Sequence, residues 1–564
     1  MRWTKMLLIV ACLAAALSAT TAHAVAIVPT SFQVSSGHWL FDSSWDMGMP
    51  TPSSDALIGN GGTAHIEPGH PDAPATANNL FVDDGTVHIS YIQSPSDPQL
   101  ALVTTAAFLG APGATGSVAI DTDPAPMSLW MPEVPHWVSG SLAVGAGGTG
   151  TVAVRGGKVE VTTASIGEVP GSVGTVDLQN MSALLAYGGG GSLTVGDAGE
   201  GHLDMADLSL VTVDACTVGA QAGSEGTVDM TSLSILEVYG DLVVGGAGRG
   251  EVTVTDCDGP VFEWGWEESH NAGVTCMANC VLGASPTGDG TLTLTRSMLE
   301  AYFGSLTVGQ SGTGHVTLGE NASMTVYGCC IGALPGSDGV IDVVGPNALV
   351  NCFAPMYVGG TADGPGGTGL LRVHEDCSLS FYPAVYVLDG GTVEAAGGEI
   401  TGNTLYLQGG TATGSGHLAC LIDNGGLVSP GNSIGRLGTF GDYIQRDGGK
   451  LLIEIEAIDS FDRVRAASIT IEPGAILDIV FLGGYVPAPG DYFDFLTGRN
   501  TVTGEFTAIT ITEPTGAEDL FFDVVQLDEG FRLEVSAPIP EPASMALLGV
   551  GLLALARRRR HGRD

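Results

Sequence analysis

The sequence predicts an all-β protein whose centre is a right-handed parallel β-helix, a solenoid of about ten coils. Three observations predict this fold. Glycine supplies 85 of the 564 residues, a pair of an aliphatic residue and glycine recurs roughly every 25 residues, and alternating aliphatic residues follow each pair. Such alternation is typical of a strand with one buried face. A strand repeated at a fixed period buries that face by stacking on its neighbours.

The aliphatic–glycine pair occurs nine times, and the longest interval between its glycines separates Gly245 from Gly283. A second glycine follows each first one a short distance later. The nine pairs are Val144-Gly145, Ile166-Gly167, Val195-Gly196, Val218-Gly219, Val244-Gly245, Leu282-Gly283, Val308-Gly309, Ile331-Gly332 and Val358-Gly359. The second glycines are Gly150, Gly174, Gly201, Gly226, Gly250, Gly290, Gly314, Gly339 and Gly369. Because glycine adopts positive φ angles without steric cost, we expect these glycines to form the corners of the coils.

We expect a strand after each second glycine. Two and four residues after it, every unit has an aliphatic residue or Met, and the residue between them is mostly Asp or Thr. The expected core pairs are Val152/Val154, Val176/Leu178, Leu203/Met205, Val228/Met230, Val252/Val254, Leu292/Leu294, Val316/Leu318, Ile341/Val343 and Leu371/Val373. The residues between them belong to the opposite, solvated face of the strand.

The repeat also sets the expected domain organisation. We expect an entry or cap region of β-structure at residues 25–104 and the β-helix repeats at 105–425. A separate, smaller C-terminal β domain is expected at 426–535, where runs of alternating apolar residues continue without the glycine pairs.

Residues 1–24 have the pattern of a secretory signal peptide. Arg2 and Lys5 precede an apolar stretch, and Ala22 and Ala24 stand at the two small-residue positions of a cleavage site. Cleavage is therefore expected after Ala24.

Residues 536–564 have a different pattern. Pro540, Glu541 and Pro542 precede an apolar run at 543–556. The four residues after this run are Arg557, Arg558, Arg559 and Arg560. Fourteen helical residues rise about 21 Å, which is short of a hydrocarbon core of roughly 30 Å. We therefore expect a short, marginal transmembrane helix with its arginines on the cytoplasmic side. An ordinary tail anchor is the alternative.

The order of Pro-Glu-Pro triplet, short apolar helix and arginine cluster resembles the PEP-CTERM sorting signal. The resemblance implies an exosortase as partner, cleavage near Pro540-Glu541-Pro542 and transient anchoring in the inner membrane. It also implies delivery to the cell surface or extracellular matrix of a Gram-negative-type bacterium. The coils resemble the repeats shared by autotransporter passengers and PEP-CTERM proteins, over roughly residues 105–425.

The charge balance excludes one class of partner. The chain has 61 acidic and 19 basic residues, for a net charge of −42. Without the charged residues of the signal peptide and those after Ala556, 12 basic and 60 acidic residues remain, a net charge near −48. Because nucleic acid binding requires clustered cations, we expect no nucleic acid partner.

The longest interval between repeat glycines contains an insertion near residues 256–276, with Trp264 and Trp266 flanked by carboxylates. Insertions in solenoids often carry binding, and two tryptophans suit stacking on a sugar. If the insertion binds a ligand, the expected partner is exopolysaccharide or another surface protein. The alternative is a loop pinned by a Cys257–Cys276 disulfide, whose tryptophans cover the side of the solenoid.

Nine cysteines remain after signal removal. Cys216, Cys280 and Cys329 each lie three residues before a repeat glycine, and we expect them to fill space in the core. Cys352 and Cys377 are separated by the length of one coil, so a disulfide between neighbouring coils is a second hypothesis.

No catalytic residues, metal site or cofactor are expected. Carboxylates are numerous but recur at coil spacing, as on a solvated strand face, and no standard zinc or nucleophile pattern is present. Calcium on the acidic face is the one alternative left open. The sequence thus predicts an exported structural or adhesive protein of the cell surface or exopolysaccharide matrix. The alternative is a carbohydrate-binding protein or polysaccharide-active enzyme on the same scaffold.

Overall fold

The computed structural model describes residues 30–59, 61–66, 74–91, 100–122, 135–257, 260–261, 270–271 and 273–537. In these residues the chain is all-β, with a single 3-10 turn at Asp42–Ser44 and no α-helix. The chain divides into two compact units. The first runs to Gly240 and includes Gly248–Glu251, and the second contains Asp241–Ala247, Val252–Asp258 and everything from Gly273 onward.

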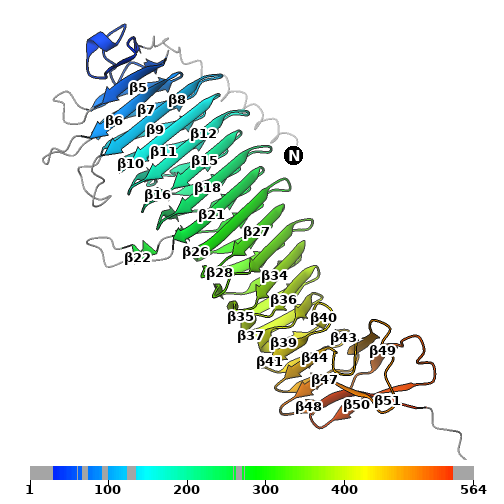
Figure 1. The fold of residues 1–564 in the computed structure, drawn as a ribbon. Helices are drawn as coiled ribbons and strands as arrows, with labels where there is room; N and C mark the ends of the chain where they lie inside the picture. The colour runs from blue at the N-terminus through cyan, green and yellow to red at the C-terminus, as the bar shows by residue number, and fades with distance from the viewer. Residues whose placement is uncertain are drawn as a thin grey trace, which may run out of the picture. The chain divides into compact units, whose positions relative to one another are not determined.

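In the first unit, every coil contributes one strand to a sheet C and one or two strands to a sheet A, and all of these strands pair in parallel (Figure 1). Sheet C contains β2 (Ser36–His38), β4 (Gly62–Ile66), β6 (Gly85–Tyr91), β8 (Thr115–Thr122), β10 (Thr149–Arg155), β12 (Val173–Gln179), β15 (Glu200–Met205) and β18 (Glu225–Thr231). Sheet A contains β1 (Thr30–Ser31), β3 (Ala56–Ile58), β5 (Ala75–Val82), β7 (Leu100–Leu109), β9 (His136–Val144), β11 (Lys158–Ile166), β13 (Ala183–Ala186), β14 (Ser192–Val195), β16 (Leu210–Val213), β17 (Ala215–Val218) and β19 (Ile235–Val238). The strand β21 (Arg249–Cys257) is divided between the two units.

The second unit repeats this arrangement. Sheet C contains the first part of β26 (Asp289–Val308), β27 (Thr313–Leu318), β29 (Asp338–Val343), β34 (Thr368–His374), β36 (Gly391–Ala396), β38 (Thr411–Gly414), β40 (Leu427–Pro430), β43 (Lys450–Ile455), β46 (Ile476–Phe481) and β49 (Ala508–Thr512). Sheet A contains β20 (Leu242–Val244), β24 (Gly273–Cys276), β25 (Cys280–Leu282), the rest of β26, β28 (Ser323–Ile331), β30 (Leu349–Cys352), β31 (Met356–Val358), β35 (Ser378–Leu388), β37 (Glu399–Gln408), β39 (His417–Asn424), β41 (Arg436–Thr439), β42 (Tyr443–Gln445), β44 (Arg463–Ala466), β45 (Ile469–Ile471), β47 (Tyr492–Gly498), β48 (Val502–Thr503), β50 (Phe521–Leu527) and β51 (Gly530–Ser536). Two short hairpins, β22 (Pro260–Val261) with β23 (His270–Asn271) and β32 (Gly360–Thr361) with β33 (Gly364–Pro365), lie outside these sheets.

The predicted repeat positions coincide in space. Within the first unit, Gly150, Gly174, Gly201 and Gly226 lie opposite one another in successive strands. All eighteen residues of the expected core pairs are buried, none more than 2% exposed. Burying a Val or Leu side chain contributes roughly 1.5–3 kcal/mol, and here each is enclosed by the coils before and after it. The chain is therefore a parallel β-solenoid within each unit.

The two glycines of each repeat serve different purposes. The first glycines all have positive φ, between 63° and 81°, as the corners require. The second glycines are needed because the backbone approaches closely. A Cβ on Gly201 would lie 2.2 Å from the nitrogen of Gly196 and 2.5 Å from the carbonyl oxygen of Ile166. The spacing of the glycines therefore shows where the corner of each coil packs against the backbone of the neighbouring coil.

The boundaries expected at residues 105 and 425 are not visible in the strand pairing. Before the glycine repeats begin, β2, β4, β6 and β8 already pair in parallel. After they end, β40, β43, β46 and β49 continue sheet C in parallel, so the pairing shows no separate β domain from residue 426. The coils continue because alternating apolar residues still bury one face, as Leu451 and Ile453 do.

Each unit is closed at one end. In the first unit, Trp39 and Trp45 are buried with their ring centroids 4.9 Å apart, and the indole of Trp45 donates to the Trp39 carbonyl at 2.9 Å. In the second unit, β47, β51 and β50 pair antiparallel, which ends the parallel stacking. Solenoids need such caps because a terminal coil otherwise exposes an apolar face and an open strand edge.

Candidate functional site

Most of the predicted site residues lie outside the described residues. They are Ala22, Ala24, Trp264, Trp266, Pro540, Glu541, Pro542, Arg557, Arg558, Arg559 and Arg560. Of the insertion near residues 256–276, the structure describes an antiparallel pair of strands, β22 and β23. None of the helices in the described ranges is long and apolar enough to cross a membrane, and the expected membrane helix at 543–556 falls beyond those ranges.

The disulfide predicted between Cys352 and Cys377 is not formed. Both residues are thiols, and Cys352 lies opposite Phe381 of the next coil rather than opposite Cys377. The Cys377 thiol donates to the carbonyl of Gly345 at 2.9 Å, and that of Cys352 to Ala354 at 3.2 Å. Burial raises the pKa of Cys352 to about 11. The prediction was wrong because this coil is longer than the spacing between the two cysteines.

The disulfide predicted between Cys257 and Cys276 is also absent. Each sulfur is a thiol that donates to a nearby carbonyl oxygen, Cys257 to Thr255 at 3.4 Å and Cys276 to Asn279 at 3.3 Å. Burial raises the pKa of Cys276 to about 11, which disfavours the reactive thiolate.

Three other cysteines occupy the core positions expected of them. Cys216, Cys280 and Cys329 are at most 1% exposed, and Leu306 lies between Cys280 and Cys329 in successive strands. Burial raises the pKa of Cys280 and Cys329 well above the usual value for a thiol.

The aspartates between the core pairs align into a ladder on the outer face of sheet C. Asp177, Asp204 and Asp229 lie opposite one another in β12, β15 and β18. The pKa of Asp204 is raised, first by partial burial and then by the charges of Asp229 and Asp177. Within the described ranges no group of three or more His, Cys, Asp or Glu residues is arranged to hold a metal ion.

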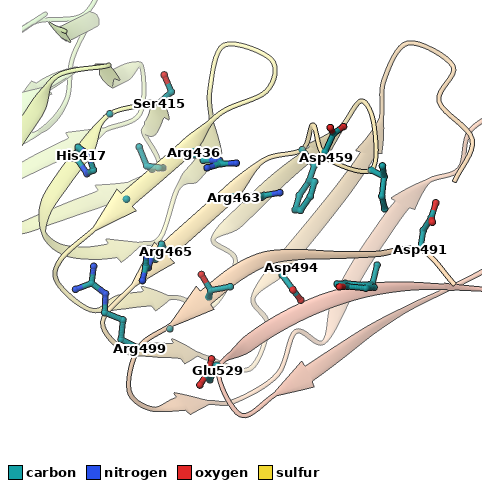
Figure 2. A pocket seen from close by; sticks show the side chains of 18 of the residues that line it. Ser415, His417, Arg436, Asp459, Arg463, Arg465, Asp491, Asp494, Arg499 and Glu529 are labelled. Atoms are coloured by element: carbon teal, nitrogen blue, oxygen red, sulfur yellow. The ribbon is translucent and has the colours of Figure 1, made fainter.

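A cavity of about 1180 Å³ lies in the second unit, where β39, β41, β44 and β47 meet the C-terminal antiparallel strands (Figure 2). Its charged lining residues are His417, Arg436, Arg463, Arg465, Arg499, Asp459, Asp491, Asp494 and Glu529. Four arginines and four carboxylates therefore share one cavity of a strongly acidic protein.

The arginines are placed by the strand register. Arg436 in β41 lies opposite Arg463 in β44, and Arg465 lies opposite Gly438 on one side and Thr497 on the other. Arg463 and Arg465 are two residues apart in one strand, so they share its outer face. Like charges directly opposite one another in adjacent strands are destabilising.

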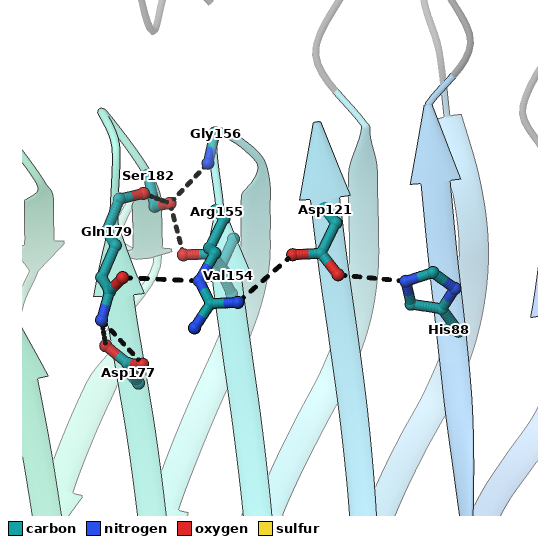
Figure 3. A network of polar contacts seen from close by, with 8 residues as sticks. All are labelled: His88, Asp121, Val154, Arg155, Gly156, Asp177, Gln179 and Ser182. Carbon is teal, nitrogen blue, oxygen red and sulfur yellow. Dashed lines mark hydrogen bonds and ion pairs between the residues drawn. The ribbon is translucent and has the colours of Figure 1, made fainter. Parts of the chain in front are cut away.

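These four arginines differ from every other lysine or arginine in the described chain. The other eight cations there each have a carboxylate oxygen within 4.0 Å, whereas Arg436, Arg463, Arg465 and Arg499 have none. Figure 3 shows the usual situation on sheet C, where Arg155 lies 3.9 Å from Asp121, which in turn contacts His88 at 3.0 Å.

Two of the four lining carboxylates, Asp494 and Asp491, hydrogen-bond to groups other than these four arginines. Asp494 lines the cavity but accepts both hydrogen bonds of the Arg532 guanidinium, at 2.6 and 3.1 Å. Asp491 accepts from the backbone N–H of Ala488 at 2.7 Å. Partial burial, followed by the charge of Arg436, lowers the pKa of Arg463. The charges of Asp494 and Asp459 act in the opposite direction on that pKa. The four arginines thus lie near carboxylates of the same cavity without an ion pair to any of them.

Aromatic rings support two of the guanidinium groups. That of Arg463 lies 4.1 Å from the centroid of Phe461, and that of Arg499 lies 5.4 Å from the centroid of Phe440. A guanidinium that stacks on a ring keeps its N–H edge available for a planar anion.

The sequence reasoning missed this site. A signal was present, because six of the twelve cations in the described chain lie between Arg436 and Arg499, and Arg463 and Arg465 have the spacing of one strand face. The spacing alone does not show that Arg436 and Arg499 line the same cavity as these two residues.

Comparison with known protein families gives a match at the C-terminal end of the chain. No curated protein matches the chain, and no family model names its repeats. The model of the PEP-CTERM protein-sorting motif matches residues 538–560, which include Pro540-Glu541-Pro542 and the four arginines from Arg557 to Arg560. The motif indicates exosortase-dependent export and sorting to the surface. The chain therefore carries a PEP-CTERM protein-sorting motif at residues 538–560.

Proposed function

We propose that this protein is a structural or adhesive component of the cell surface or the exopolysaccharide matrix. The observation that carries the proposal is a sorting motif at residues 538–560 on a chain whose described part consists of stacked coils. A stack of coils presents a long, regular surface, which suits a spacer or a scaffold. We take its coils as right-handed, because crossovers between parallel strands almost always are.

The proposal includes two processing steps. The signal peptide is removed after Ala24, and a short helix at 543–556 holds the chain in the inner membrane until an exosortase cleaves near Glu541. A helix too short for a comfortable span favours transient rather than permanent anchoring.

Exposed aromatic side chains support an adhesive role. Tyr327, Phe353 and Tyr382 are 56%, 60% and 60% exposed. The residue before each ring lies opposite the residue before the next ring, in the neighbouring strand of sheet A. The three rings therefore occur on successive coils. Exposed aromatic residues are enriched where proteins contact partners.

Sorting is tested by Glu541→Ala in the producing bacterium, followed by fractionation and detection of the chain. We expect the full-length variant to remain in the membrane fraction, while the exposed control Glu513→Ala is released like the wild type. Release of Glu541→Ala at the wild-type level would overturn exosortase sorting through this motif.

The second candidate is a carbohydrate-binding protein or a polysaccharide-active enzyme on the same solenoid, and the arginine-lined cavity favours binding. We propose a role without catalysis and without a cofactor. The test is to incubate the mature protein with acidic polysaccharides, with and without calcium. Shortening of the polymer would favour the enzyme, and retention that is lost in Trp264→Ala would place binding on the insertion.

A further inference from the structure

The arginine-lined cavity places like charges close together, and none of its four arginines forms an ion pair within the described chain. The protein has 61 acidic residues, yet the four cations without a carboxylate partner in the described chain all line this cavity. Arg436 and Arg463 are moreover directly opposite each other. Sequences are locally consistent with their folds except where function requires otherwise, so a conflict of this kind points to a ligand.

The arginines that line the cavity indicate that its ligand is an anion. A guanidinium presents paired N–H groups in a plane, which match the two oxygens of a carboxylate or phosphate. Two such groups in register, with no ion pair to a carboxylate, suit an anion that would relieve their mutual repulsion.

The size and the mixed lining indicate a sugar rather than a bare anion. About 1180 Å³ is comparable to the space that a drug-sized ligand occupies, and far exceeds one phosphate. Asp459 and Glu529 line the same cavity and suit sugar hydroxyls, which donate to carboxylates. Tyr492 also lines the cavity and is 53% exposed, and the guanidinium of Arg532 lies 4.1 Å from its ring centroid.

We propose that this cavity binds a uronate-containing saccharide, with a sugar carboxylate held between Arg436 and Arg463. Arg465 and Arg499 face neighbouring acidic units of the same polymer. The inference deepens the proposed function, on which it rests for the source of the ligand. Because the remaining surface is strongly acidic, an acidic polymer is attracted at this cavity and repelled elsewhere.

The test uses the purified mature protein, isothermal titration calorimetry and a trigalacturonate probe, with EDTA present so that calcium cannot bridge acidic groups. The matched neutral probe is the methyl ester of the same trisaccharide, and inorganic phosphate is the third ligand. We expect trigalacturonate to bind at least tenfold more tightly than either of the others, and more weakly as salt is raised.

The variant Arg436→Gln/Arg463→Gln should lose at least tenfold in affinity for trigalacturonate. The control Arg249→Gln removes an exposed arginine that pairs with Glu225 and Glu251, and should bind like the wild type. Circular dichroism verifies folding, and Arg499→Gln, at an exposed position, replaces the double variant if that fails to fold.

Equal binding of the methyl ester, or unchanged affinity in the cavity variants, would overturn the proposal. Phosphate binding as tight as that of trigalacturonate would show a simple anion site and overturn the saccharide assignment. This experiment is separate from the sorting test, because binding by purified protein does not depend on Glu541 processing.

Discussion

Arg436 and Arg463 lie directly opposite each other in the adjacent parallel strands β41 and β44, and within the described chain neither forms an ion pair with a carboxylate. In a protein with a net charge of −42, two neighbouring guanidinium groups would be expected to attract carboxylates. The register of the two strands places the arginines side by side, and this placement links the coils to the proposed recognition of an anion.

We predict that Arg436→Gln stabilises the ligand-free protein. The substitution removes a like-charge contact between adjacent strands, worth roughly 0.2–1 kcal/mol. Urea denaturation monitored by circular dichroism should show a small rise in midpoint, whereas Arg249→Gln should show none. A lower midpoint for Arg436→Gln would mean that the side chain has a stabilising contact that its register does not reveal.

Gly201→Ala should destabilise the corner of its coil more than Gly223→Ala does. A Cβ on Gly201 meets backbone atoms at 2.2 and 2.5 Å, whereas Gly223 has a φ of +84° and open space around it. We expect a cost of about 1–3 kcal/mol or more from overpacking at Gly201, against about 1 kcal/mol of backbone strain at Gly223. Thermal unfolding of both variants measures the difference, and equal losses would contradict the close-approach explanation.

Leu203→Ala should loosen the first unit locally by about 2–5 kcal/mol, because its side chain is fully buried between neighbouring coils. Thr175→Ala, on the outer face of the preceding coil, should change stability by less than about 0.5 kcal/mol. Hydrogen exchange suits this test, since solenoids lose structure coil by coil. We expect faster exchange in β12, β15 and β18, and uniform protection in both variants would contradict a shared core.

Asp462 should make stability depend on pH. It is fully buried, accepts from the N–H groups of Gly435 and Glu454 at 2.8 and 2.9 Å, and burial raises its pKa to about 7. Because the folded state binds this proton more tightly than the unfolded chain does, stability should rise as pH falls from 8 through 7 and level off near 4. The slope is at most about 1.4 kcal/mol per pH unit.

The dependence of stability on pH that Asp462 causes should vanish in Asp462→Asn and persist in the exposed control Asp523→Asn. Urea denaturation between pH 4 and 8 measures it. A wild-type slope that is unchanged in Asp462→Asn would show that another group controls it.

Cys352 and Cys377 should both be alkylated when the purified protein is unfolded without a reducing agent. The structure places Cys352 opposite Phe381, and burial suppresses its thiolate in the folded state. Peptide mass spectrometry measures the labelling. A Cys352–Cys377 cross-linked peptide would contradict the register of β30 and β35.

The sequence by itself determined the features that are local or periodic. The glycine pairs identified the corners, the alternating residues such as Leu203 and Met205 identified the buried face, and the segment from Pro540 to Arg560 identified the sorting motif. Each of these signals lies within one short stretch or repeats along the chain, so it can be read without knowing which coils touch.

The tertiary structure decided which residues of different coils meet. Coil length varies, so Cys352 lies opposite Phe381 rather than Cys377, and parallel coils continue beyond both expected boundaries without the glycine pairs. The same register brings Arg436 to Arg463 across a whole coil and makes a site from residues far apart in sequence. Contacts between coils depend on the summed length of every turn and strand between them, and no local pattern encodes that sum.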